Sequence, residues 1–197
     1  SFITLGALEN GSTKPNAVIL SGSTFPNRWE TKAGLGLARF EQWRLGTHNS
    51  SPLLQAAFFG AFNRPFRPNR TEFDWLSRDT REVDKYIQDP LCGFKCTTSL
   101  WTDVLKGLCQ VYSPKGFAQL PQVPYLLVSG AQDPVGKNNG VIKLKGKLEA
   151  ANHQTTMHLY PDGRHEMLNE TNRQEVLEKI GNWVSQGTES ALQESRL

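Results

Sequence analysis

The chain has 197 residues, 38% of them hydrophobic and 10% aromatic, which is enough to fill one ordinary globular domain. Its formal net charge of +3 comes from 22 basic and 19 acidic residues that are scattered along the chain, so no basic tail or stripe indicates nucleic-acid binding. No apolar run approaches the roughly 18 residues of a membrane-spanning helix, and transient contact with a membrane surface stays open.

The first residues, SFITLGALENG (1–11), predict a short helix. Apolar residues recur there at helix-compatible spacing, namely Phe2, Ile3, Leu5 and Leu8. Gly11 is well placed as the left-handed residue that ends a helix. The run AVILSGS (17–23) is apolar without alternation, which indicates a strand covered on both faces, as in parallel sheets. We assign residues 1–23 to an α/β core.

Residues 24–119 do not continue this pattern, and we call them the helical insertion. Three of their segments have helical apolar spacing: 51–68, 79–90 and 97–108. Four of the five tryptophans lie here, namely Trp29, Trp43, Trp75 and Trp101. An aromatic-rich helical segment between two strands is either a cap, or lid, over a substrate pocket or a subdomain with a small core of its own. Composition alone leaves both interpretations open.

The three cysteines, Cys92, Cys96 and Cys109, are odd in number. No second cysteine pair or nearby histidine completes a zinc site with Cys92 and Cys96, so we interpret all three as thiols. Free thiols favour a reducing compartment, in line with a cytoplasmic location. We expect neither a metal nor another cofactor.

The C-terminal part alternates strands and helices. Strands are predicted in PYLLVSGAQD (124–133) and TTMHLYPDG (155–163), and helices between them and after them, at 138–154 and 172–186. One face of the last helix is apolar, through Val176, Ile180, Trp183 and Val184. This order is typical of an α/β sheet with right-handed crossovers. We assign residues 120–186 to the α/β core and expect residues 187–197 to be a loose tail.

Two titratable side chains follow the ends of the later strands. Asp133 lies in a turn with Pro134 after the second strand, and His165 follows the third in YPDGRHEMLNE (160–170). Taken singly, an aspartate before proline is a common turn residue and a loop histidine is more often a surface residue. Because the carboxyl ends of parallel strands meet at one edge, we expect the two side chains to converge there. A carboxylate at that edge would hold the imidazole through its Nδ1 proton.

The segments AVILSGS, GAFNRPFRP, FDWLSRD, DPLCGF, SGAQDPVG and DGRHEMLNE resemble α/β-hydrolase fold enzymes of the monoacylglycerol lipase, lysophospholipase and serine aminopeptidase type. The resemblance covers nearly the whole chain. It implies the later strands and helices of an α/β-hydrolase parallel sheet with a helical cap insertion. It also implies that Asp133 is the acid and His165 the base of a Ser-His-Asp catalytic triad.

The nucleophile is not evident in the sequence. These enzymes present it in a G-x-S-x-G turn, which does not occur in the 197 residues. The resemblance implies that the chain begins just after its nucleophile, and that a companion segment of roughly 100 residues supplies the serine and the oxyanion hole. The three strands would then leave an apolar inner edge unpaired, and this chain alone would be inactive. Other nucleophile candidates are weaker: Ser1, Ser21, Ser23 and Cys92.

Three functions follow from the resemblance and the site. The first is hydrolysis of carboxylic esters of a small lipid-like substrate, a monoacylglycerol or a lysophospholipid. The second is amide or peptide hydrolysis, which an acidic cluster that binds a free amine would favour. Four acidic residues lie close together, namely Asp74, Asp79, Glu82 and Asp84, but interleaved basic residues favour a solvated helix face. The third is a non-catalytic interaction module that keeps the fold, since fold alone does not establish function.

Overall fold

The structure is a computed structural model that describes residues 1–11, 13–136 and 139–194. Its centre is a parallel sheet in the order β1-β2-β3, formed by Val18–Ser21, Tyr125–Gly130 and Thr155–Tyr160. Leu20 pairs with Leu127, and Leu127 with Met157. The predicted α/β class and all three strands are therefore confirmed, but β1 is not covered on both faces as expected, since Ile19 is 38% exposed. Within the described ranges β1 pairs with β2 alone, so its other edge carries no strand.

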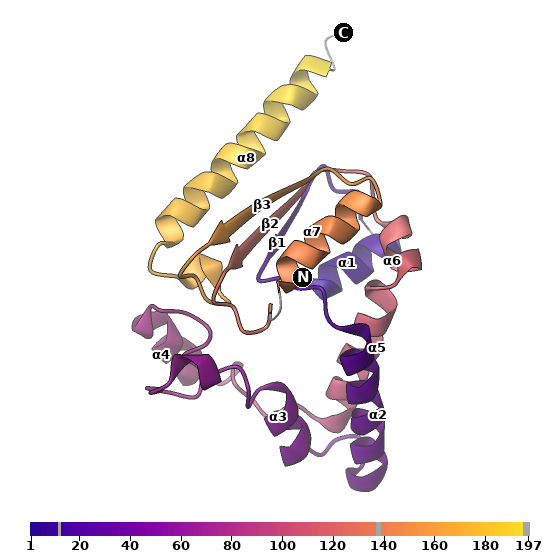
Figure 1. Cartoon of the computed structure of the whole chain (residues 1–197), viewed down its shortest axis with the longest axis vertical. Coiled ribbons are helices and arrows are strands. Elements are labelled where there is room, and N and C mark those ends of the chain that lie inside the picture. Colours follow the sequence, from indigo (N-terminus) through magenta and orange to yellow (C-terminus); the bar gives the residue numbers. More distant parts are fainter. Residues whose placement is uncertain (12, 137–138, 195–197) are drawn as a thin grey trace.

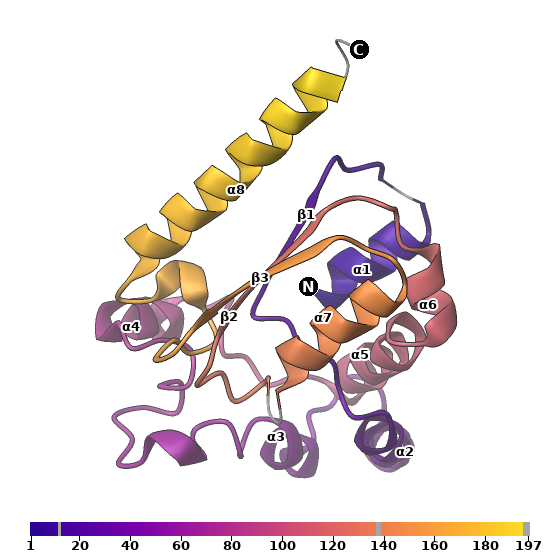
Figure 2. The same ribbon diagram turned by 45° about the horizontal axis from the view of Figure 1, so that its top comes forward.

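Helices cover both faces of the sheet (Figures 1 and 2). On one face lie α1 (Phe2–Glu9), α6 (Pro114–Gln119) and α7 (Gly140–Ala150), and on the other lies α8 (Arg173–Glu194). Alternate residues of β2 enter two cores: Tyr125 and Leu127 pack with α1, α6 and α7, whereas Leu126 and Val128 pack toward α8. All six residues of β2 are buried, which is why its sequence shows no polar alternation.

Helices α1 and α8 confirm the two helices predicted at the ends of the chain, but α8 differs from its prediction in its buried face and its length. Gly11 follows α1 with φ +65°, as expected of a helix-ending glycine. Val176 of α8 is fully buried, and Ile180 and Trp183 pack beside it, but Val184 is 44% exposed. The predicted apolar face therefore ends at Trp183, one residue earlier than expected. Helix α8 also continues to Glu194, through most of the segment expected to be a loose tail, and residues 195–197 lie outside the described residues.

The helical insertion contains α2 (Arg28–Leu45), α3 (Pro52–Phe58), η1 (Arg64–Phe66), α4 (Thr80–Gln88) and α5 (Thr98–Val111). It has a small core of its own, in which the rings of Phe58 and Trp101 stack 4.4 Å apart beside Leu54 and Leu105. The end of α5 and all of α6 join the main core instead, through Val111 and Phe117. The range 24–119 therefore includes residues that pack against the sheet.

Helix α2 is the one long element that the sequence patterns did not indicate. Asn27 caps it, because its side chain accepts hydrogen bonds from the backbone N–H groups of Trp29 and Glu30. Gly34 and Gly36 lower the helix propensity of its interior, so the sequence pattern does not predict a helix there. Gly34 instead permits close packing, since a Cβ there would lie 3.0 Å from the Phe58 ring. No helix in the described part of the chain is both long and apolar enough to cross a membrane.

Candidate active site

The two residues predicted at the sheet edge do meet. His165 Nδ1 lies 2.9 Å from Asp133 Oδ2. Because an ionised carboxylate only accepts hydrogen bonds, Nδ1–H is the donor in this pair. The carboxylate is 1% exposed and the imidazole side chain 26% exposed, so the ring is open on one side. Among the described residues none hydrogen-bonds Nε2, which leaves this nitrogen available to take a proton.

A tight turn after β2 holds Asp133. Its Oδ1 accepts a hydrogen bond of 2.8 Å from Val135 N–H, two residues on. The turn touches the loop after β3 directly, since Gln132 N–H donates to Gly163 O at 2.9 Å. A Cβ on Gly163 would lie 3.0 Å from Gly130 Cα. Two glycines thus bring the acid loop and the base loop into backbone contact.

The loop between β3 and α8, residues 161–172, carries His165, and we call it the histidine loop. The ring of Trp75, from the helical insertion, lies 5.2 Å from the imidazole, centroid to centroid. The backbone N–H of His165 donates to Trp75 O at 3.4 Å. The insertion therefore contacts the candidate base itself, a contact that sequence reasoning missed because 90 residues separate the two segments.

Gly22, directly after β1, forms the third wall of the site. It has φ +61°, and a Cβ on it would lie 2.9 Å from His165 O and 3.2 Å from His165 Nδ1. Sequence analysis placed SGS at the end of the strand segment 17–23 and assigned Gly22 no role at the site. The positive φ and the close approach explain why glycine occupies the middle position.

We expect Gly22→Ala to lower the free energy of unfolding by about 1–3 kcal/mol, because alanine is strained at this φ and its methyl group would press on His165. Gly36→Ala is the matched control, since a Cβ there meets nothing within 4 Å on helix α2. The control should be neutral or stabilise by up to about 1 kcal/mol. Urea denaturation of both variants checks this, and equal stability of the two would show that the His165 contact is not tight.

The other nucleophile candidates lack the surroundings of an activated group. Ser1 stands at the N-terminal cap of α1, and Ser21 is the last residue of β1. Ser23 is 1% exposed, and its Oγ has no hydrogen-bond partner among the described residues. Burial, with Asp89 nearby, raises the pKa of the Cys92 thiol, which reduces the reactive thiolate at neutral pH. All three cysteines are free thiols.

The four carboxylates of the acidic cluster in the insertion bind arginine, lysine or backbone N–H groups of the chain itself. Asp84 pairs with Arg70 at 2.7 Å and Glu82 with Lys85 at 2.9 Å. Asp74 accepts hydrogen bonds from the backbone N–H groups of Arg70 and Thr71, and Asp79 binds two arginines. Paired carboxylates of this kind do not form an open site for a free amine. Asp79 is nevertheless buried, so the expectation of a solvated face does not hold for it.

A cavity of about 440 Å³ lies between α2, α5, α6 and α7. Apolar side chains dominate its wall, among them Phe25, Leu108, Tyr112 and Phe117. Neither Asp133 nor His165 lines it, so it is separate from the candidate site. The described residues include no group of three or more His, Cys, Asp or Glu that could hold a metal ion.

Comparison with known proteins identifies the family. A family described as serine aminopeptidase, S33, matches residues 1–172, and the chain therefore belongs to this family. A comparison with curated proteins gives no match.

Solved structures agree on the fold. A carboxyl esterase from Bacillus coagulans, in complex with glycerol, is 22% identical with a TM-score of 0.81, over 93% of this chain and 61% of the esterase. A monoglyceride lipase from Saccharomyces cerevisiae is 16% identical with a TM-score of 0.65, over 94% and 59% of the two chains. A monoacylglycerol lipase from Paleococcus ferrophilus is 18% identical with a TM-score of 0.60, over 94% and 65%. The chain thus has an α/β-hydrolase fold and spans about three fifths of the esterase.

Proposed function

We propose that this chain is the acid and base part of a serine hydrolase that cleaves carboxylic esters. The observation that carries the proposal is the 2.9 Å contact between His165 Nδ1 and Asp133 Oδ2 at the carboxyl edge of a parallel sheet. Membership of a serine aminopeptidase family supports hydrolysis, and the similar folds of an esterase and two monoacylglycerol or monoglyceride lipases favour esters.

In this mechanism a serine hydroxyl attacks the acyl carbonyl while His165 Nε2 takes its proton. Asp133 keeps the second ring proton on Nδ1 and stabilises the imidazolium that forms. His165 then gives the proton to the leaving alcohol, and a water molecule activated by the same nitrogen hydrolyses the acyl-enzyme. One imidazole thus serves as base and acid in turn, with Asp133 never changing its charge.

The nucleophile in this proposal lies on a further segment, either earlier in the same polypeptide or on a separate chain. No G-x-S-x-G occurs in residues 1–197, and the similar esterase is longer than this chain. No strand of the described residues pairs with the outer edge of β1, which offers a place for such a segment to extend the sheet. We call residues 1–197 together with this segment the completed hydrolase.

The proposed substrate is a monoacylglycerol or a lysophospholipid, met in the cytoplasm or at a membrane surface. Aromatic side chains on α2 support transient surface contact, since Trp29 is 79% exposed, Trp43 80% and Phe40 53%. The insertion supplies these aromatics and also reaches the candidate base through Trp75, as a cap over the site would. The second candidate is amide hydrolysis, which the name of the family favours.

Comparing an ester with an amide distinguishes the two candidates. We expect the completed hydrolase to cleave 1-monoacylglycerol and p-nitrophenyl esters at least about a hundredfold faster, in kcat/KM, than aminoacyl p-nitroanilides, a difference of about 2.7 kcal/mol in transition-state binding. Faster cleavage of the anilides would replace the ester proposal with the amide one. Cleavage of neither would favour a non-catalytic module.

A further inference from the structure

Residues 74–79 of the helical insertion lie along the histidine loop, and we call them the clamp. Three hydrogen bonds join the two segments through the backbone of the loop. His165 N–H donates to Trp75 O at 3.4 Å, and Glu166 N–H donates to Leu76 O at 2.8 Å. Ser77 Oγ donates to Asn169 O at 2.8 Å. The clamp therefore follows the loop from His165 to Asn169.

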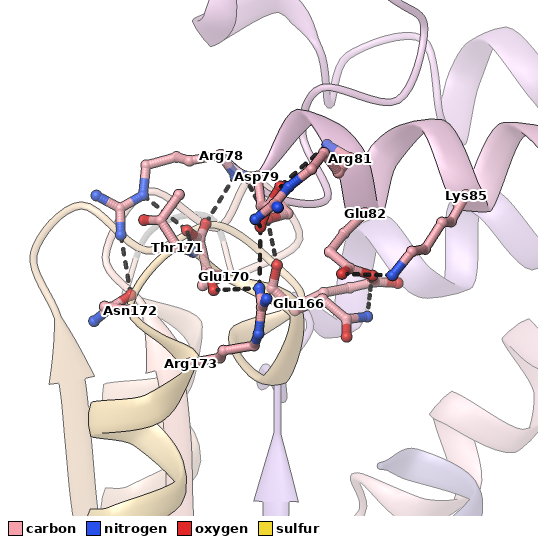
Figure 3. A network of polar contacts seen from close by, with 12 residues as sticks. Arg78, Asp79, Arg81, Glu82, Lys85, Glu166, Glu170, Thr171, Asn172 and Arg173 are labelled. Carbon is pink, nitrogen blue, oxygen red and sulfur yellow. Dashed lines mark hydrogen bonds and ion pairs between the residues drawn. The ribbon is translucent and has the colours of Figure 1, made fainter.

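The carboxylate of Glu170 binds both the clamp and the histidine loop (Figure 3). Its side chain is fully buried, and each carboxylate oxygen accepts from both segments. Oε1 accepts from the backbone N–H of Arg78 at 3.1 Å and of Arg164 at 3.0 Å. Oε2 accepts from Arg78 Nε at 2.8 Å and from Thr171 N–H at 3.0 Å. Four charge-assisted hydrogen bonds leave this buried carboxylate fully satisfied.

Two more arginines bind the clamp, Arg164 from the histidine loop and Arg173 from the first turn of α8. The Arg164 guanidinium, next to His165, donates to the carbonyl oxygens of Asp74 and of Ser77, the latter at 3.1 Å. The same guanidinium lies 4.2 Å from the centre of the Phe66 ring. Arg173 donates to Asp79 Oδ2 at 3.0 Å. Hydrogen bonds from Arg81, the larger cause, and from Arg173 hold the pKa of Asp79 far below its usual range. The connections reach both ends of the clamp.

We propose that Glu170 is a positioning residue, which closes the clamp on the histidine loop and thereby fixes the imidazole of His165 against Asp133. Among the described residues, Asp133 alone hydrogen-bonds the imidazole ring. The rest of its placement comes from the backbone of a loop without a long helix or a strand, which the clamp immobilises. The catalytic part of this inference rests on the proposed function, whereas the mechanical part does not.

The clamp also limits how the insertion can move. Each residue of the clamp makes at least one hydrogen bond to the histidine loop or to the first turn of α8, so the clamp stays in place when other parts of the insertion open. Any lid motion is then confined to the elements around α2, α3 and α5, whose small core is separate.

Glu170→Gln tests the clamp in the chain itself. The NH2 group of the glutamine amide cannot accept the two hydrogen bonds that one carboxylate oxygen of Glu170 accepts. Two donors of the buried network are therefore left without this acceptor. Hydrogen exchange followed by mass spectrometry should show backbone amides of residues 72–80 and 161–172 exchanging at least about tenfold faster, both segments together. In proton NMR the Nδ1–H signal, identified by its loss in His165→Gln, should broaden or disappear.

Glu82→Gln is the matched control, because it makes the same charge change at a carboxylate that pairs with Lys85 within helix α4. It should leave both exchange and the Nδ1–H signal unchanged. If Glu170→Gln does not fold, Arg78→Gln takes its place, since it removes one of the four donors and keeps Glu170. Unchanged exchange and an unchanged Nδ1–H signal in the folded variant would overturn the proposal.

Kinetics of the completed hydrolase add a readout that separates positioning from binding. We expect Glu170→Gln to lower kcat about a hundredfold with KM changed less than about threefold, since a displaced base slows proton transfer without removing a substrate contact. A rise in KM at constant kcat would contradict the positioning role. If the wild-type completed hydrolase cleaves no ester or amide, the proposed function fails, while the exchange and NMR results still decide the clamp.

Discussion

We expect His165→Ala to lower kcat/KM of the completed hydrolase for esters by about 10⁵- to 10⁶-fold, because loss of a triad histidine costs on the order of 10⁶ in kcat. In the proposed mechanism His165 provides the single imidazole nitrogen that takes the serine proton and returns it to the leaving group. The fold should persist, because the imidazole is partly exposed and the loop is held by its backbone. Steady-state kinetics, with circular dichroism as a check of folding, measures both effects.

His48→Ala is the control for this change, because His48 is an exposed histidine of the helical insertion. It should retain activity within about twofold. Turnover by a folded His165→Ala protein at more than about a tenth of the wild-type rate would remove His165 from the mechanism, and the convergence with Asp133 would then be structural only.

We expect Asp133→Asn to lower kcat/KM about 10⁴-fold with little loss of stability. Asparagine has nearly the same shape, and its side-chain oxygen still accepts the hydrogen bond from Val135 N–H. It cannot hold the Nδ1 proton as an anion does, so the imidazole adopts the other tautomer and loses its counter-charge during proton transfer. Kinetics over a range of pH together with urea denaturation separates the catalytic effect from the structural one.

Asp103→Asn, at an exposed position of α5, is the matched control and should behave like the wild type. A loss of stability of several kcal/mol in Asp133→Asn would show that the carboxylate is needed mainly for the fold. A loss of activity below about tenfold would argue against its role in orienting the imidazole.

The α/β class and the meeting of Asp133 with His165 were predictable from the sequence because both depend on local patterns. The short runs around Ile19, Leu127 and Met157 predict strands of a parallel sheet, and right-handed crossovers bring the ends of neighbouring strands to one edge. Only the strand assignments and this topology are needed to place two loops side by side. The 2.9 Å contact between His165 Nδ1 and Asp133 Oδ2 in the structure confirms that step.

The surroundings of the pair could not be predicted, because they depend on contacts between distant segments. Nothing local in FDWLSRD indicates that Trp75 and Leu76 accept hydrogen bonds from the histidine loop. The burial of Glu170 is equally hidden, since a charged residue near the start of a helix normally reads as solvent-exposed. The sequence around Gly22 is compatible with an ordinary turn, and only the distance to His165 shows that a side chain would not fit there.

A fluorophosphonate probe, which labels activated serines, tests the central claim most directly when it is applied to the completed hydrolase and to its His165→Ala variant. Peptide mass spectrometry then locates the label. We predict one labelled serine, in a G-x-S-x-G turn outside residues 1–197, with labelling lost in His165→Ala. Labelling of Ser1, Ser21 or Ser23, or labelling of any serine that does not depend on His165, would contradict the account.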